Sequence, residues 1–108
     1  QLRQPYLGVR YVTLTDAAAS GFDLEVKRGA YLAPSQEGPS VLPDSPAAKA
    51  GLKEGDIITR VNGIELDENT NLSSALGRFR VGDKVTLTVR RGDQSVRLQV
   101  TLETSPQD

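Results

Sequence analysis

The chain has 108 residues, of which 37% are hydrophobic and 25% are charged, and its formal net charge is −1. These values fit one globular domain with its own core, and they argue against a disordered chain and against a polybasic nucleic-acid-binding protein. The sequence contains no cysteine and no histidine, which excludes disulfides, zinc–thiolate sites and Ser-His or Cys-His nucleophile pairs.

A Tyr-Leu-Gly-Val loop at residues 6–9 is the first informative element. A glycine between apolar residues allows a tight turn whose backbone N–H groups converge, and such a concavity binds an anion, typically a carboxylate. Residues 9–15 alternate well enough to predict a half-buried strand. Together the two elements indicate a device that holds a peptide by its C-terminal end along a strand edge. The alternative for the loop is a strand entry with a glycine bulge.

The next segments are short. Residues 16–20 favour a helical turn closed by Gly21. Residues 24–26 and 30–32 are expected to form short strands, whereas residues 34–39 are rich in Pro, Gly and Ser and are expected to form a loop.

Residues 45–51 carry a helix signature, with a serine cap, a proline at the first helical position and a glycine past the end. Residues 57–61 predict a strand. Asn62-Gly63 is the strongest short hairpin signal in the chain, and residues 64–66 would be the return arm.

The apolar residues between positions 71 and 79 recur at intervals of three and four, which predicts an amphipathic helix with Asn69 or Thr70 as its cap. Residues 85–89 and 96–102 alternate apolar and polar side chains and are the two clearest strands.

The order of these pieces resembles a PDZ domain, and more narrowly the bacterial PDZ domain carried behind the protease domain of HtrA-type serine proteases. The resemblance rests on four motifs: Tyr-Leu-Gly-Val, Gly-Ala-Tyr-Leu at residues 29–32, the run from Ser-Pro-Ala-Ala to Gly-Asp-Ile-Ile at residues 45–58, and Val-Asn-Gly at residues 61–63. It implies a single domain over residues 1–108, with a core at about residues 5–102 and a tail at residues 103–108.

The fold implied by the resemblance is mainly β with two helices, a small partly open β-barrel or sandwich of five or six strands. A groove would lie between the strand that starts at Val9 and the helix that starts at Asn71. One departure from the family pattern is a Pro- and Gly-containing insertion at residues 33–40, which makes the strand assignment over residues 29–42 depend on the path of this segment.

The resemblance also implies a set of site residues. The backbone N–H groups of residues 7–9 would hold a terminal carboxylate, with Arg3 supporting it through water. The pocket for the last side chain would be walled by Leu7, Val9, Leu76 and Phe79. Tyr11 would flank the next pocket, and Asn71 and Ala75 would face the peptide. Leu72 and Phe79 are expected to be mainly core and Ala75 to be exposed. The full set is Arg3, Tyr6, Leu7, Gly8, Val9, Arg10, Tyr11, Asn71, Leu72, Ala75, Leu76 and Phe79.

The function implied is a non-catalytic module that captures C-terminal or extended hydrophobic peptides by strand addition and serves as a substrate-recruiting or regulatory domain of an HtrA-type serine protease. Expected partners are polypeptide C-termini, unfolded segments and the tethered protease domain, without nucleic acid, metal or cofactor. Family analogy places the domain in the cell envelope, periplasmic or otherwise extracytoplasmic. The absence of an apolar run near 20 residues predicts no membrane insertion, and a start at Gln1 suggests a piece of a longer chain.

Two alternatives remain open at the level of sequence. In one, the groove or a free sheet edge packs against a neighbouring domain and fixes oligomer geometry without binding a diffusing peptide. In the other, the domain belongs to a different parent, such as a C-terminal processing protease or a membrane-embedded protease.

Overall fold

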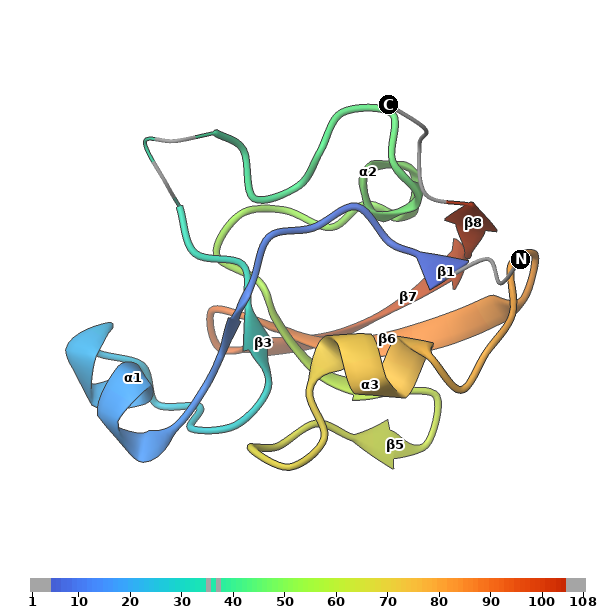
Figure 1. Ribbon diagram of the computed structural model, residues 1–108. Coiled ribbons are helices and arrows are strands. Elements are labelled where there is room, and N and C mark those ends of the chain that lie inside the picture. The colour runs from blue at the N-terminus through green and yellow to red at the C-terminus, as the bar shows by residue number, and fades with distance from the viewer. Residues whose placement is uncertain (1–4, 35, 37, 105–108) are drawn as a thin grey trace.

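The computed structural model describes residues 5–34, 36 and 38–104 (Figure 1). Within these ranges the chain forms eight strands and three helices, and the strands lie in two open sheets. The expected mainly β class is confirmed. The sheets do not close into a barrel, and a short helix, α1 (Asp16–Gly21), stands where a helical turn was predicted and adds a third helix to the two expected.

The main sheet follows the strand order β2-β3-β4-β6-β7, and β5 pairs with β4 beside this path. The predicted strands at residues 57–61, 85–89 and 96–102 are confirmed, and β6 and β7 form a long antiparallel hairpin. The bounds are β2 Val12–Thr13, β3 Ala30–Tyr31, β4 Ile57–Val61, β5 Ile64–Glu65, β6 Lys84–Arg91 and β7 Gln94–Thr101.

A second sheet joins the two ends of the described chain. β1 (Pro5–Tyr6) pairs antiparallel with β8 (Glu103–Thr104). The sequence placed the latter residues in a tail, because a pair of two-residue strands carries no periodic signal. The expected tail at residues 105–108 lies outside the described residues.

Two strand predictions are wrong. Residues 24–26 form no strand, because they belong to the irregular connection that follows α1. Of residues 9–15, only Val12–Thr13 form a strand, while Val9 makes an isolated antiparallel bridge with Val41. The insertion at residues 33–40 therefore ends beside the first segment of the chain and takes part of the edge that a longer strand would have used.

Helix α2 (Pro46–Ala50) has the caps that the sequence predicts. The Ser45 Oγ accepts a hydrogen bond from the Ala48 N–H at 3.1 Å and donates one to the Leu42 carbonyl at 2.7 Å. Gly51 ends the helix with a left-handed φ of +99°. A helix of five residues is not stable by itself, so these caps and its packing hold it in place.

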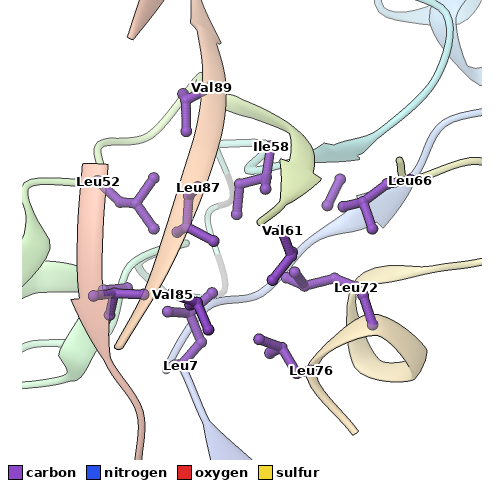
Figure 2. Packing of buried hydrophobic residues seen from close by; sticks show 14 of the residues in the cluster. Leu7, Leu52, Ile58, Val61, Leu66, Leu72, Leu76, Val85, Leu87 and Val89 are labelled. Atoms are coloured by element: carbon purple, nitrogen blue, oxygen red, sulfur yellow. The ribbon is translucent and has the colours of Figure 1, made fainter. Parts of the chain in front are cut away.

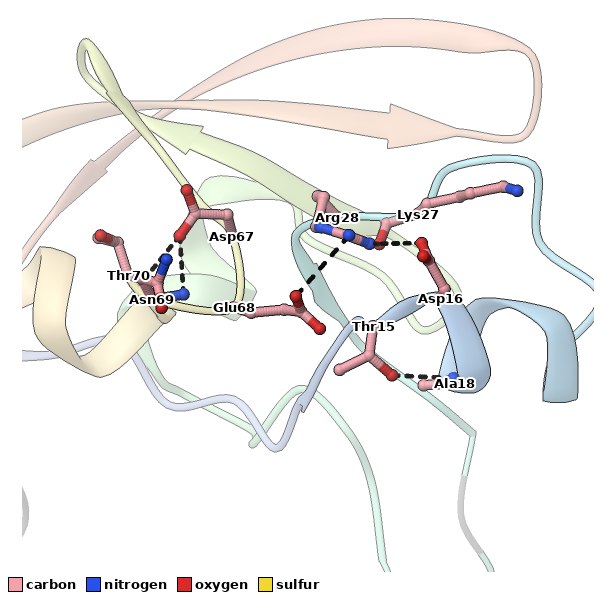
Figure 3. Close-up of polar contacts among 9 residues, drawn as sticks. All are labelled: Thr15, Asp16, Ala18, Lys27, Arg28, Asp67, Glu68, Asn69 and Thr70. Carbon is pink, nitrogen blue, oxygen red and sulfur yellow. Dashed lines mark hydrogen bonds and ion pairs between the residues drawn. The ribbon is translucent and has the colours of Figure 1, made fainter.

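Helix α3 (Leu72–Leu76) is shorter than the 71–79 range that was expected, and it ends at Gly77. Its cap is Asn71, whose Oδ1 accepts a hydrogen bond from the Ser74 N–H at 2.8 Å. The prediction of Asn69 or Thr70 as the cap is wrong. Both residues belong to a preceding turn, in which the Asp67 Oδ1 accepts their N–H groups at 2.9 and 2.8 Å (Figure 3).

A surface ion pair lies next to that turn. The Arg28 guanidinium donates a hydrogen bond to the Asp16 carboxylate at 2.9 Å and lies 3.7 Å from the Glu68 carboxylate (Figure 3). The hydrogen bond with Asp16 is the main cause that raises the pKa of Arg28 above its ordinary value. Because the side chains are exposed, water screens this interaction and its contribution to stability is small.

The core lies between the main sheet, α2 and α3. Leu7, Leu72, Leu76 and Val85 point toward one another from the first segment, from α3 and from β6 (Figure 2). All four side chains are buried. Burial of a side chain of this size stabilises a fold by about 1.5–3 kcal/mol, so α3 is held mainly by this contact.

An ion pair between a buried carboxylate and a partly exposed guanidinium fixes the turn between α2 and β4. The Asp56 carboxylate is 1% exposed and accepts hydrogen bonds from the Arg91 Nε and Nη2 at 3.0 and 2.8 Å and from the Lys53 N–H at 3.0 Å. The hydrogen bond with Asp56 is also the main cause that raises the pKa of Arg91 above its ordinary value. This bidentate pair fastens the end of β6 to the Gly-Asp turn.

The Asp56→Asn variant is expected to lose about 2–3 kcal/mol of unfolding free energy, because it leaves the Arg91 guanidinium without a charge partner at a buried contact. The control Asp16→Asn removes the exposed partner of Arg28 and is expected to leave the unfolding free energy nearly unchanged. Urea unfolding of both variants measures the difference. Equal losses would contradict the role assigned to burial.

Candidate functional site

The loop at residues 6–9 is fixed by two of its carbonyl groups. The Leu7 carbonyl accepts a hydrogen bond from the Ala47 N–H in the first turn of α2 at 2.9 Å, and the Gly8 carbonyl accepts one from the Leu42 N–H at 2.9 Å. In a trans peptide the carbonyl and the following N–H point in opposite directions. The N–H groups of Gly8 and Val9 therefore point away from α2 and from Leu42.

These two N–H groups have no internal acceptor. Within the described ranges, no backbone or side-chain oxygen accepts a hydrogen bond from Gly8 or Val9, although Gly8 itself is buried. Adjacent N–H groups that project to the same side form an anion-binding concavity. The geometry thus provides two neighbouring donors for an oxygen ligand.

Only glycine fits at position 8. Its φ is +87°, in the left-handed region that side chains avoid. A Cβ at this position would lie 2.2 Å from the Ser45 Cβ, far inside van der Waals contact. The glycine in the Leu-Gly-Val triplet is therefore required by the close approach of the loop to the cap of α2.

The chain that leaves the loop has one open edge. The Arg10 N–H donates to the Ser40 carbonyl at 2.7 Å and the Leu14 N–H donates to the Gly29 carbonyl at 2.9 Å. Since backbone groups of successive strand residues face opposite sides, the N–H and C=O groups of Val9, Tyr11 and Thr13 face the other way. In the described sheet β2 is the terminal strand, so this side is an unpaired edge next to α3.

A tyrosine links this edge to α3. The Tyr11 hydroxyl accepts a hydrogen bond from the Ser73 N–H at 3.1 Å and lies 2.9 Å from the Ser73 Oγ. Together with the Leu7–Ala47 hydrogen bond, this contact places the first segment of the chain between α2 and α3 (Figure 1). The segment that starts at Val9 therefore lies beside α3, as the sequence analysis expected.

The apolar residues predicted at the site share the core with α3. Leu7 and Leu76 are 3% and 7% exposed, whereas Val9 and Phe79 are half-buried and pack against the same cluster. All four side chains thus belong to one core cluster or pack against it (Figure 2 shows Leu7 and Leu76).

Two predictions for α3 have different outcomes. Leu72 is a core residue with 1% exposure, as expected. Ala75 is 0% exposed, so the expectation that it is exposed is wrong. The exposed side of this short helix carries Ser73 and Ser74 instead, because the helix is rotated to bury Ala75 against the core.

The remaining predicted residues lie around the loop. Tyr6 is half-buried in β1, and Arg10 is exposed, with its guanidinium beside Gly38 of the insertion. The Asn71 side chain is occupied by capping α3. Arg3 lies outside the described residues.

Ser40 is a contributor that the sequence analysis missed. It is 1% exposed, its N–H donates to the Glu54 carboxylate at 3.2 Å, and its hydroxyl donates to the Ala33 carbonyl. Because its own carbonyl accepts the Arg10 N–H, Ser40 anchors the insertion to the edge segment. No periodic pattern surrounds this serine, so the sequence carried no signal for it.

Comparison with known proteins gives a consistent result. The family model described as PDZ domain matches residues 5–102. The chain is 36% identical over 105 residues to the periplasmic pH-dependent serine endoprotease DegQ of Escherichia coli (strain K12), covering 97% of this chain and 22% of DegQ. It is 33% identical over 108 residues to the periplasmic serine endoprotease DegP of the same strain, covering 100% of this chain and 22% of DegP. The chain thus spans about a fifth of the length of these curated relatives.

Solved structures show the same likeness. The HtrA3 PDZ domain bound to a phage-derived ligand (FGRWV) superposes with a TM-score of 0.74 at 28% identity, over 96% of this chain and 89% of that one. The HtrA-type protease AlgW with a decapeptide superposes with a TM-score of 0.78 at 28% identity, over 100% of this chain and 31% of that one.

A membrane-spanning helix is not found among the described residues, since each helix there is too short or too polar for that role.

The Gly8→Ala variant is expected to lose more than about 2 kcal/mol of unfolding free energy, because a Cβ there combines a left-handed φ with an overlap against Ser45. The matched control is Gly51→Ala, where φ is also left-handed but no atom lies within 4 Å of the added carbon. The control is expected to lose about 1 kcal/mol. Denaturant unfolding measures both, and equal losses would contradict the steric role of Ser45.

Proposed function

The chain belongs to the PDZ domain family, and from this premise we propose that it captures the C-terminal end, or an extended hydrophobic segment, of another polypeptide by strand addition. The observation that carries the proposal is the pair of N–H groups on Gly8 and Val9, which point away from the fold without an internal acceptor, at the start of an unpaired strand edge. A terminal carboxylate matches this donor pair in charge and in size.

The backbone geometry specifies a register for the peptide. With its carboxylate at the Gly8 and Val9 N–H groups, the peptide runs antiparallel to residues 9–13. The N–H of its last residue then faces the Val9 carbonyl, and the residue two positions earlier faces the N–H and carbonyl of Tyr11. The residue between them turns its backbone groups away from the strand.

The side-chain contacts follow from this register. The last side chain of the peptide lies against the apolar group of Leu7, Val9, Leu76 and Phe79, which favours an aliphatic or aromatic residue there. Tyr11 and Asn71 border the next positions, and Tyr6, Arg10, Leu72 and Ala75 support the walls from β1, the edge segment and α3. Arg3 lies outside the described residues, and its support of the carboxylate through water stays a prediction from the sequence.

The expected affinity is modest. Charge-assisted hydrogen bonds contribute about 1.5–3 kcal/mol each, and burial of one Val or Leu side chain adds about 1.5–3 kcal/mol. Association costs at least about 4 kcal/mol. With two such hydrogen bonds the net is at most about 5 kcal/mol, which corresponds to a dissociation constant of about 0.2 mM or weaker and suits reversible capture.

The proposed context is a longer protein. Relatives about five times the length of this chain are named as periplasmic serine endoproteases, and the neighbouring solved structures include peptide-bound HtrA-type proteins. We therefore propose that the domain recruits substrate for, or regulates, a tethered serine protease domain in the cell envelope, and that it holds no catalytic residue itself.

The carboxylate is tested from the peptide side, since substitution of Gly8 also disturbs the fold. A pentapeptide ending in a free Val carboxylate is expected to bind about 30- to 100-fold more tightly than its C-terminally amidated twin, because amidation removes the charge from two hydrogen bonds. Isothermal titration calorimetry of both peptides gives the ratio. Equal affinities would remove the loop from the proposal.

Strand addition is tested by methylating the peptide backbone. N-methylation of the last residue is expected to weaken binding at least about tenfold, because it removes the donor to the Val9 carbonyl and introduces a methyl group at the edge. N-methylation of the penultimate residue is the control, since that N–H points away from the strand. Equal effects at the two positions would contradict the register.

A further inference from the structure

A second exposed surface lies on the outer face of the main sheet. Val12, Tyr31, Ile57 and Arg90 are paired in one row across β2, β3, β4 and β6. The adjacent row contains Ala30, Ile58 and Val89, which are buried in the core. Because successive side chains of a strand point to opposite faces, the first row points away from that cluster, although Ile57 itself is only 5% exposed.

Exposed apolar side chains gather at this row. Val12 is 36% exposed and Phe22 is 44% exposed, and they are the large hydrophobic side chains that the described part of the chain leaves this open. Both adjoin Tyr31: Val12 is its cross-strand partner, and the Phe22 ring lies edge-on to the Tyr31 ring with centroids 4.9 Å apart. We call Val12, Phe22 and Tyr31 the Tyr31 patch. Such clustering marks a contact surface rather than scattered exposure.

A cavity of about 240 Å³ adjoins the Tyr31 patch, between the connection after α1 and the β6–β7 turn. Tyr31, Ile57 and Arg90 form its sheet side. The Arg90 Nε is buried and finds no acceptor among the described residues. A buried donor without an acceptor costs stability, but this atom has almost no accessible surface, so it is not itself a contact for an occupant of the cavity.

The charges around the cavity favour a positively charged partner. Three carboxylates line it, those of Asp23, Glu25 and Asp93, against the single guanidinium of Arg90. The neighbouring Arg91 is engaged by Asp56, and Lys27 and Arg28 line a different cavity. A lysine or arginine beside the apolar contact would meet this excess of negative charge.

We propose that the Tyr31 patch and its cavity form a second docking surface, which binds a polypeptide segment that presents an apolar side chain next to a lysine or arginine. The apolar side chain packs on Phe22 and Tyr31, and the cation lies among the three carboxylates. The surface stands on residues other than the Gly8 and Val9 donors, so it does not depend on capture of a peptide end.

The test uses two capped peptides, acetyl-Lys-Leu-Phe-Lys-amide and acetyl-Glu-Leu-Phe-Glu-amide, titrated into the isotope-labelled domain and followed by amide chemical shifts. Neither peptide has a terminal carboxylate. The basic peptide is expected to shift residues 22–25, 31 and 90–93 and to bind at least about tenfold more tightly than the acidic one. Equal binding of the two peptides, or shifts confined to residues 7–11, would overturn the proposal.

Variants test the two parts of the surface separately. The double variant Glu25→Gln with Asp93→Asn is expected to lower the affinity for the basic peptide at least about fivefold. The control Asp44→Asn with Glu65→Gln makes the same change in net charge at exposed positions elsewhere, and it is expected to leave that affinity unchanged. Phe22→Ser is expected to abolish the shifts of residue 31. Unchanged affinity in the first variant would contradict the assigned partner. Self-association of the wild-type domain in sedimentation that Phe22→Ser abolishes would contradict it as well.

Discussion

The binding site depends on the orientation of two peptide groups, those that join Leu7 to Gly8 and Gly8 to Val9. Their orientation decides where the N–H groups of Gly8 and Val9 point. The carbonyls of Leu7 and Gly8 are held by N–H groups from α2 and from Leu42, and this fixes the direction of the N–H groups on their far side. No side chain of the site has to be ordered on binding for these donors to be in place. A preorganised main-chain site of this kind depends on the fold around it rather than on the chemistry of any one side chain.

Ser45 joins the local stability of α2 to this loop. Its hydroxyl caps the helix, and its Cβ occupies the space that any side chain at position 8 would need. The first turn of α2 in turn supplies the N–H that holds the Leu7 carbonyl. Helix α2 therefore supports the loop and sets its geometry, although Val9 and Ser45 are 36 positions apart in the sequence.

The sequence was most informative where the decisive contacts are local. The cap signals of α2 and the alternation in β4, β6 and β7 act within a few residues, and these elements were predicted well. The cap of α3 was misplaced because Asp67 binds two backbone N–H groups that a helix start would otherwise use. The pairing of β1 with β8, the bridge between Val9 and Val41 and the burial of Ala75 come from tertiary packing, which no short-range pattern records. The loop itself was identified, whereas the availability of its donors required the structure.

The brevity of β2 has a consequence for solubility. An unpaired strand edge is also a template for identical chains, and long exposed edges promote aggregation. Here the regular strand is limited to Val12–Thr13, and helix α1 starts at Asp16, which stops further extension. The Tyr11–Ser73 hydrogen bond also holds α3 next to this edge. The unpaired edge is therefore long enough to pair with one short peptide, and its shortness disfavours the stacking of further identical chains.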